Sequence, residues 1–135
     1  MMAASSAAAP VRISSQSDKV NLSQKLTLFK RYWDPKIVGE LNGQQLKLVK
    51  FKGEFVWHKH ENADELFLVI NGSFDMQFRD GTVTLNEGEF IIVPRGTEHC
   101  PKAEYEVHVM LIEPIGTRNT GDVKNDKTIY KPSHI

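Results

Sequence analysis

Hydrophobic and polar residues alternate along most of the chain in short runs, and the runs end at turn-forming residues. Asn-Gly pairs at 42–43 and 71–72 and an Asp-Gly pair at 80–81 separate three pairs of runs. Alternation with a period of two is typical of strands with one buried face, and such dipeptides are typical of β-hairpins. Strands are expected at 36–40, 45–51, 54–58, 65–70, 74–79, 82–85, 90–93 and 104–112. The pattern predicts an all-β sandwich or barrel of antiparallel hairpins.

One segment before these strands has a helical period instead. Its large apolar residues recur at spacings of three and four and are Leu22, Leu26, Phe29 and Trp33. This spacing predicts one amphipathic helix from Asn21 to Trp33, capped by Asn21 or Ser23 and stopped by Asp34-Pro35. Its apolar stripe is expected to pack against the body of the protein.

The composition predicts a single folded domain between two polar segments. Residues 1–17 are rich in Ala and Ser and are interpreted as a mobile arm. The arm is poor in acidic residues, as organellar transit peptides are, although it is short and contains one arginine. Residues 18–114 form the domain, and the polar tail at 115–135 is expected to pack on the surface or on a partner subunit.

Charge and cysteine content exclude several classes of protein. Lys plus Arg and Asp plus Glu both number 17, so the net charge of 0 gives no reason to expect nucleic acid or an anionic membrane as a partner. No apolar run approaches the roughly 20 residues that a membrane span requires. Cys100 is the only cysteine, which excludes an internal disulfide. We expect a soluble cytoplasmic protein, with an organellar location as the weaker alternative.

The stretch from Trp57 to Glu65 contains the candidate chemistry. His58 and His60 are two residues apart, so both imidazoles point to the same face of an extended strand. Four residues then allow a tight turn before Glu65 opens the next apolar strand. Such a hairpin brings a carboxylate beside two imidazoles, and these groups are ligands for Zn, Fe, Mn, Ni and Co.

A third imidazole follows a turn later in the chain. Pro94-Arg95-Gly96-Thr97 predicts a turn after Val93, and His99 lies at the start of the next segment. A turn of this kind can return His99 towards the first two histidines.

The order and spacing of these residues resemble the two motifs of the cupin superfamily. The residues that match the first motif are Gly53, His58, His60, Glu65 and Gly72. The residues that match the second are Gly88, Pro94, Gly96 and His99. The first spacer has four residues instead of five, and the closing asparagine of the second motif is absent. The resemblance covers about residues 48–114.

This resemblance implies a double-stranded β-helix, or jelly-roll barrel, that holds one divalent transition metal ion (Fe, Mn, Ni, Co or Zn). The implied metal ligands are His58, His60, Glu65 and His99. Three nitrogens and one oxygen leave about two positions of an octahedral ion open, which favours chemistry over a structural role. Phe67 and Val69 share the face of Glu65 and are expected to line the barrel.

Several functions are compatible with such a site, because the fold does not choose the reaction. Our first hypothesis is a metal-dependent enzyme of the isomerase, lyase or dioxygenase type. Its substrate would be a small oxygenated molecule such as a sugar derivative or a hydroxy or keto acid. The alternatives are a non-catalytic binding or sensing module and a barrel whose metal only ties strands together. The sequence nominates no catalytic base besides Glu65, which is taken as a ligand. The resemblance also implies a homodimer.

Other polar residues near the motifs receive ordinary interpretations. Glu61 and Asp64 are expected to face water, His108 to be an ordinary strand residue, and Cys100 to be buried as a small apolar side chain. Arg95 either steers an anionic substrate or is solvated, and the solvated alternative is favoured.

Overall fold

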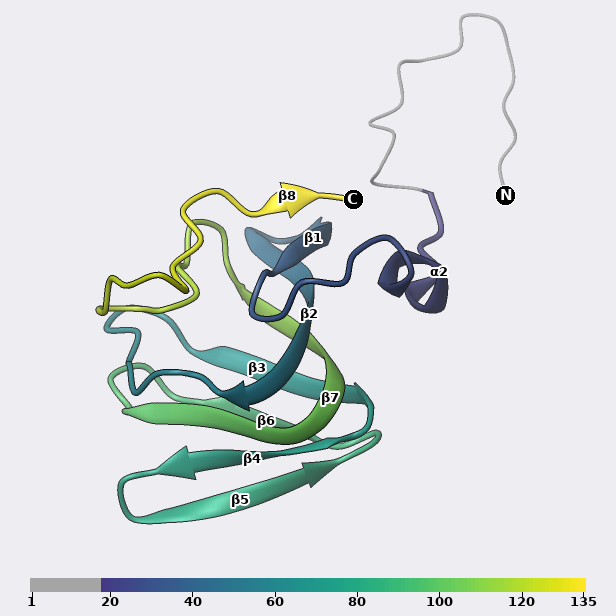
Figure 1. The fold of residues 1–135 in the computed structure, drawn as a ribbon. Coiled ribbons are helices and arrows are strands. Elements are labelled where there is room, and N and C mark those ends of the chain that lie inside the picture. Colours follow the sequence, from purple (N-terminus) through teal and green to yellow (C-terminus); the bar gives the residue numbers. More distant parts are fainter. Residues whose placement is uncertain (1–17) are drawn as a thin grey trace, which may run out of the picture.

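The computed structural model describes residues 18–135, which form one short helix and eight strands (Figure 1). The helix is α2 (Leu22–Leu26). The strands are β1 (Lys36–Leu41), β2 (Gln44–Glu54), β3 (Glu65–Asn71), β4 (Ser73–Phe78), β5 (Gly81–Asn86), β6 (Phe90–Val93), β7 (His99–Pro114) and β8 (Ser133–His134). The all-β class is confirmed. The mobile arm predicted at 1–17 lies outside the described residues.

The long strand β7 connects the two faces of the barrel. Strands follow the order β5-β4-β7-β2-β1-β8, while β3 adds to β7 and β6 adds to β3. The first four residues of β7 pair with β4 and its later part pairs with β3, while β2 pairs with β7 from Lys102 to Pro114. Both long strands are strongly curved in Figure 1. This arrangement confirms the predicted jelly roll, with β5 and β6 each paired on one side only among the described strands.

Local turn chemistry explains the first hairpin. Leu41 pairs with Gln44, so Asn42 and Gly43 alone form the connection. Both have positive φ angles, 53° and 78°. A two-residue turn with this backbone matches the twist of the flanking strands and favours Asn-Gly.

The strand predicted at 54–58 is not a separate strand. β2 continues to Glu54, with a register shift between Phe51 and Gly53, and the chain then leaves the sheet. His58 returns only as an isolated bridge to His99. Gly53 has a φ of 85°, which bends the chain at this point.

The predicted helix from Asn21 to Trp33 is wrong in extent, because α2 has only five residues. Asn21 caps its start, accepting a hydrogen bond from Gln24 N at 2.9 Å. Phe29 packs in a cluster on the outer face of the sheet, whereas Trp33 packs in the inner core. One straight helix cannot place these two side chains on opposite sides of a sheet. The chain unwinds between them and reaches Trp33 with a φ of 60°.

The inner core fills the space between the two faces of the barrel. Along β3 the inward residues Glu65, Phe67 and Val69 are buried, and the outward residues are half-buried. The prediction that Phe67 and Val69 line the interior is therefore confirmed. Because Glu65 is the first inward residue of this strand, its carboxyl group points into the barrel.

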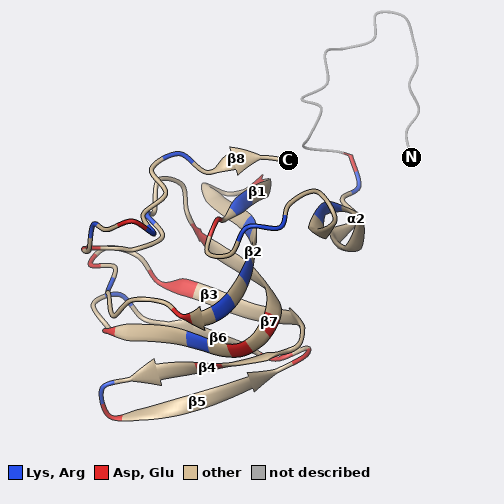
Figure 2. Cartoon of the chain, viewed as in Figure 1, with Lys and Arg blue, Asp and Glu red and all other residues tan. Residues whose placement is uncertain are grey.

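The C-terminal segment contacts the backbone of Trp33 and Lys59 and ends beside β1. β8 pairs with β1 in parallel, and Thr120 and Thr128 are buried and share a hydrogen bond of 2.7 Å. Figure 2 shows basic and acidic residues interspersed along the chain, consistent with the balanced charge. Within 18–135, no helix has the length and apolar character needed to cross a membrane.

Candidate metal centre

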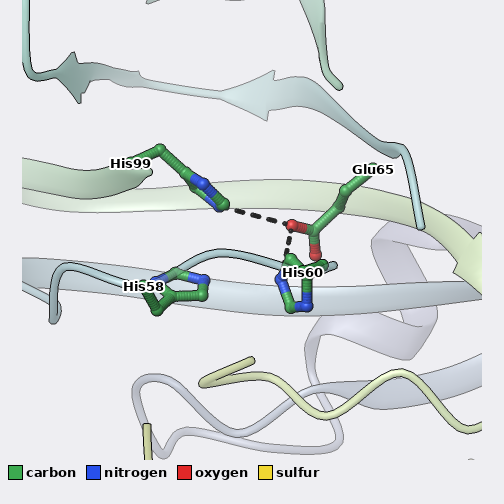
Figure 3. Close-up of side chains that lie close together, drawn as sticks. All are labelled: His58, His60, Glu65 and His99. Atoms are coloured by element: carbon green, nitrogen blue, oxygen red, sulfur yellow. Dashed lines mark ion pairs between the residues drawn. The ribbon is translucent and has the colours of Figure 1, made fainter. Parts of the chain in front are cut away.

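The four nominated ligands come together inside the barrel (Figure 3). His58, His60, Glu65 and His99 are all buried, and their ligand atoms lie within 4.8 Å of one another. Two ligands on opposite sides of an ion, each about 2.1 Å away, are about 4 Å apart. The cluster therefore has nearly the dimensions of a single-ion site.

Backbone hydrogen bonds connect the two motifs. His58 and His99 exchange two of them, N to O at 3.0 Å and 2.9 Å. Gly96 N donates to the carbonyl of His60 at 2.8 Å. The turn that the sequence predicts after Val93 thus holds the second motif against the first, and it brings the third imidazole to the other two.

The C-terminal segment holds Lys59, the residue between the first two histidines. Asp122 N donates to Lys59 O at 3.2 Å, and Lys59 N donates to Asp122 Oδ1 at 3.0 Å. Gly121 makes this approach possible, because a Cβ at its position would clash with the Lys59 carbonyl and press on the His58 ring. Arg118 donates two hydrogen bonds to Gly121 O, at 2.9 Å and 2.7 Å.

Hydrogen bonds to backbone carbonyls fix the tautomers of two histidines. His58 Nδ1 lies 2.9 Å from Val56 O, and His99 Nδ1 lies 2.8 Å from Thr97 O. A carbonyl oxygen only accepts, so each Nδ1 carries the proton and donates it. Each Nε2 therefore presents a lone pair, which is the arrangement of metal-ligating imidazoles.

Three buried atoms of the cluster lack a hydrogen-bond partner among residues 18–135: His60 Nε2, His99 Nε2 and Glu65 Oε1. The two nitrogens approach Glu65 Oε1 to 3.2 Å and 3.6 Å, as the dashed lines in Figure 3 show, without hydrogen-bond geometry. The His99 lone pair facing a carboxylate is repulsive, and unpaired buried polar atoms are costly. A cation among them would satisfy all three, so these residues fit a divalent metal ion.

Electrostatics keep the ligands in their metal-binding forms. Burial, aided by the neighbouring His99, lowers the pKa of His58 to about 4, so its imidazole is neutral at pH 7. Burial alone would raise the pKa of Glu65, but the interactions of its carboxylate with Glu113, His60 and His99 outweigh burial and hold this pKa well below its ordinary value. The site therefore combines a neutral His58 imidazole with a negative Glu65 carboxylate.

A buried acidic residue beside the site was not nominated from the sequence. Glu113 on β7 adjoins the carboxyl of Glu65. Lys47 Nζ donates to Glu113 Oε2 at 2.6 Å, whereas Glu113 Oε1 has no hydrogen-bond partner among residues 18–135. Burial and the adjacent Glu65 raise the pKa of Glu113 well above its ordinary value. The predicted strand stops at Ile112, but extending its alternation by one residue would have placed Glu113 on the inner face.

An apolar cavity adjoins the cluster and includes His58 and Glu65 in its wall. Its volume is about 20 Å³, room for one water molecule. The other wall residues are mainly hydrophobic and include Trp33, Phe51, Phe55, Phe67 and Leu111. The Trp33 ring stacks on both Phe51 and Phe55, with ring centroids 4.5 Å and 4.6 Å apart.

The remaining polar residues lie outside the cluster. Arg95 N and Nε donate to Asp64 Oδ1 at 2.9 Å and 3.2 Å, and both side chains are exposed, as is that of Glu61. His108 Nε2 lies 2.6 Å from Glu106 Oε2. Cys100 is buried, and burial beside Glu54 raises the pKa of its thiol to about 11. These placements agree with the predictions for Glu61, Asp64, His108 and Cys100.

Comparison with known proteins finds similarity across this region. The family model described as "Cupin domain" matches residues 47–113, a range that contains all four clustered residues. The uncharacterized protein YdbB of Bacillus subtilis is 36% identical over 63 residues, which are 46% of this chain and 56% of that protein. The chain thus covers little more than half of this curated relative.

Two solved structures are similar over nearly their full length. A cupin-2 domain containing protein from Shewanella frigidimarina has 45% sequence identity and a TM-score of 0.70, with 70% of this chain and 93% of that chain covered. Protein NMB1881 from Neisseria meningitidis has 36% identity and a TM-score of 0.67, with 72% and 99% covered.

Proposed function

Because this chain belongs to the cupin superfamily, we propose that it is a metal-dependent enzyme acting on a small oxygenated substrate. The proposed metal ligands are His58, His60, Glu65 and His99. The observation that carries the proposal is the set of unpartnered ligand atoms in this buried cluster, beside a cavity that His58 and Glu65 help to line.

The composition of the cluster supports chemistry over a structural role. Structural zinc sites are commonly closed and rich in thiolate, whereas the one cysteine here, Cys100, is not part of the cluster. A bound Fe, Mn, Ni, Co or Zn ion would polarise a substrate oxygen as a Lewis acid, or supply redox chemistry if the ion is iron. The protein side chains hold that ion in a buried place and limit the entry of water.

The cavity wall favours one part of the expected substrate range. Hydroxyl groups buried without hydrogen-bond partners cost free energy, and this wall is mostly hydrocarbon and aromatic rings. The cavity has room for about one water molecule, so only the part of a hydroxy acid, keto acid or diketone next to its metal-binding oxygens would contact this wall. A sugar with hydroxyls on every carbon fits less well. We therefore favour a compact hydroxy or keto acid or diketone.

A non-catalytic binding or sensing module is the second candidate. Both buried carboxyls at the site already have a role, Glu65 as a proposed metal ligand and Glu113 in its ion pair with Lys47. A site with no disengaged acid or base among its buried neighbours is suited to holding a ligand without turnover.

One assay distinguishes these functions. The apoprotein is reconstituted with each of the five ions and incubated with 2-keto acids, diketones and sugar phosphates, while product formation and oxygen uptake are followed. We expect turnover of a keto acid or diketone that disappears in His60→Ala and persists in His108→Ala, which changes a histidine outside the cluster. Ligand-dependent stabilisation without turnover would select the binding module. Turnover that is unchanged in His60→Ala would contradict the metal-dependent mechanism.

A further inference from the structure

Three charged side chains from three strands lie close together inside the barrel. Glu65 is on β3, Glu113 on β7 and Lys47 on β2. Leu66 pairs with Ile112, so Glu65 and Glu113 occupy the next cross-strand position on the inner face. Opposite residues at such a position have Cβ atoms about 5 Å apart, within reach of direct contact. The register of β3 against β7 therefore places a second carboxyl beside the proposed ligand.

Glu113 and Lys47 form a buried ion pair. Lys47 Nζ lies 2.6 Å from Glu113 Oε2, and the two side chains are 2% and 0% exposed. Lys47 Nζ also donates to the carbonyl of Thr117 at 3.3 Å. Removing two charges from water is so costly that apolar pairs of similar volume are often at least as stable. Stability alone gives little reason for an ion pair at this place.

The proximity of the Glu113 and Glu65 carboxyls gives a reason for an ion pair at this place. The Glu113 and Glu65 carboxyls are buried neighbours that affect each other's pKa, and Oε1 of each lacks a hydrogen-bond partner among residues 18–135. Oε1 of Glu65 also faces His60 and His99. Glu113 is thus a neighbour of the Glu65 carboxyl that is not itself a proposed metal ligand, and Lys47 fixes the position of Glu113 through their ion pair.

We infer that Glu113 and Lys47 are positioning residues that orient the Glu65 carboxylate for metal binding. The inference rests on the proposed function, because it assumes that Glu65 is a metal ligand. Both residues act through Glu65, as outer partners of metal ligands commonly do, and loss of such partners weakens metal affinity about 10- to 100-fold.

Two variants separate positioning from a structural role. Lys47→Met combined with Glu113→Leu replaces the ion pair by apolar side chains of similar volume, which keeps the fold but removes the support behind Glu65. Glu113→Gln keeps the shape, and its amide can still donate to Glu65 and accept from Lys47. Glu106→Gln combined with His108→Gln is the matched control, because it removes a 2.6 Å ion pair from the same strand away from the cluster.

The test is titration of the apoprotein with Co²⁺, followed by its visible absorption and by competition with a chelator. We expect the Lys47→Met/Glu113→Leu variant to bind Co²⁺ about 10- to 100-fold more weakly, with an altered spectrum and an undiminished melting temperature. Glu113→Gln is expected to retain most of the wild-type affinity and spectrum, and the control variant all of it.

The outcomes distinguish the inference from the proposed function. If the folded double variant binds Co²⁺ with wild-type affinity and spectrum, the pair is structural and the inference is overturned, while the metal site stands. If the wild-type protein binds no Co²⁺, both are overturned. Should the double variant fail to fold, Lys47→Met alone removes the anchor of Glu113, and wild-type Co²⁺ affinity in that variant would equally overturn the inference.

Discussion

His58 shows how a single residue links the fold to the site. Its backbone bridges to His99, its Nδ1 donates to Val56 O, and its ring lies edge-on to Phe55 with centroids 5.4 Å apart. Burial next to His99 lowers the pKa of its imidazole to about 4. The neutral form that a metal requires is therefore also the form that the folded protein prefers.

This shift predicts how the stability of the metal-free protein depends on pH. The pKa of His58 is about 4 in the folded state, whereas an unfolded chain has about 6.5, so the unfolded state binds the proton more readily as the pH falls. The contribution of His58 to the free energy of unfolding is complete above pH 6.5 and is lost as the pH falls from 6.5 to 4. It amounts to about 3 kcal/mol.

Urea unfolding in the presence of a chelator, at pH 7 and at pH 4, measures this loss. A His58→Gln variant, which cannot take up the proton, is the control and is expected to show a smaller change between the two pH values. An equal change in both proteins would contradict the assignment to His58.

At the scale of elements, the C-terminal segment completes the site from outside the two motifs. Asp122 holds the backbone of Lys59, and Gly121 lets the segment approach closely enough to do so. Gly121 has a φ of 57°, and Gly116 in the same segment has a φ of 90°. A Cβ at Gly116 would meet nothing within 4 Å, in contrast to Gly121.

These two glycines give a matched pair of variants. Gly116→Ala is expected to cost about 1–2 kcal/mol of stability, since an L-residue at positive φ is strained. Gly121→Ala carries the same strain and also forces the segment away from Lys59, so we expect a larger loss of stability and weaker metal binding. Thermal unfolding and Co²⁺ titration of both variants test this. Equal metal affinity in the two would show that the segment does not support the histidines.

Elements were predictable from the sequence wherever local chemistry decides them. The turn at Asn42-Gly43 needs positive φ angles at both residues, which Asn and Gly adopt readily. The alternation of residues in β3 reflects its one buried face. The end of the helix was not predictable, because Trp33 leaves the helical path for tertiary reasons: its N donates to Lys50 O and its indole joins the inner core. Periodicity does not report which side of a sheet a residue reaches.

The residues of the site also divide into those that the sequence predicted and those that it did not. Motif spacing nominated all four clustered residues, because each lies within or beside a short turn whose length limits where its side chain can go. Glu113 was missed because its place beside Glu65 depends on the register of β7 against β3, two strands far apart in sequence. Lys47 was missed because a lysine in a strand ordinarily faces water, whereas here its ammonium group meets Glu113 inside the barrel.

At the scale of the molecule, the outer face of β6 and β3 presents large apolar side chains to solvent. β6 pairs only with β3 among the described strands, and its outward side chains Phe90 and Ile92 are 61% and 52% exposed. They adjoin the outward residues Leu66 and Leu68 of β3, which are half-buried. A contiguous apolar patch beside an edge strand is typical of an interface. We propose that a second copy of the chain covers this face in a homodimer.

Light scattering of the purified protein tests the dimer. Phe90→Glu combined with Ile92→Glu is expected to shift the protein to a monomer, because each change buries a charge at the proposed interface. Tyr130→Glu changes a residue of the C-terminal segment that is also highly exposed, and it is expected to leave the dimer intact. A wild-type monomer at micromolar concentration would contradict the proposal.

A crystal structure with anomalous diffraction recorded at the absorption edge of the bound metal tests whether the four clustered side chains bind an ion. We predict one anomalous peak per chain, within bonding distance of the side chains of His58, His60, Glu65 and His99. Soaking with each of Fe, Mn, Ni, Co and Zn without any peak among these four side chains, or with a peak only elsewhere on the molecule, would contradict it.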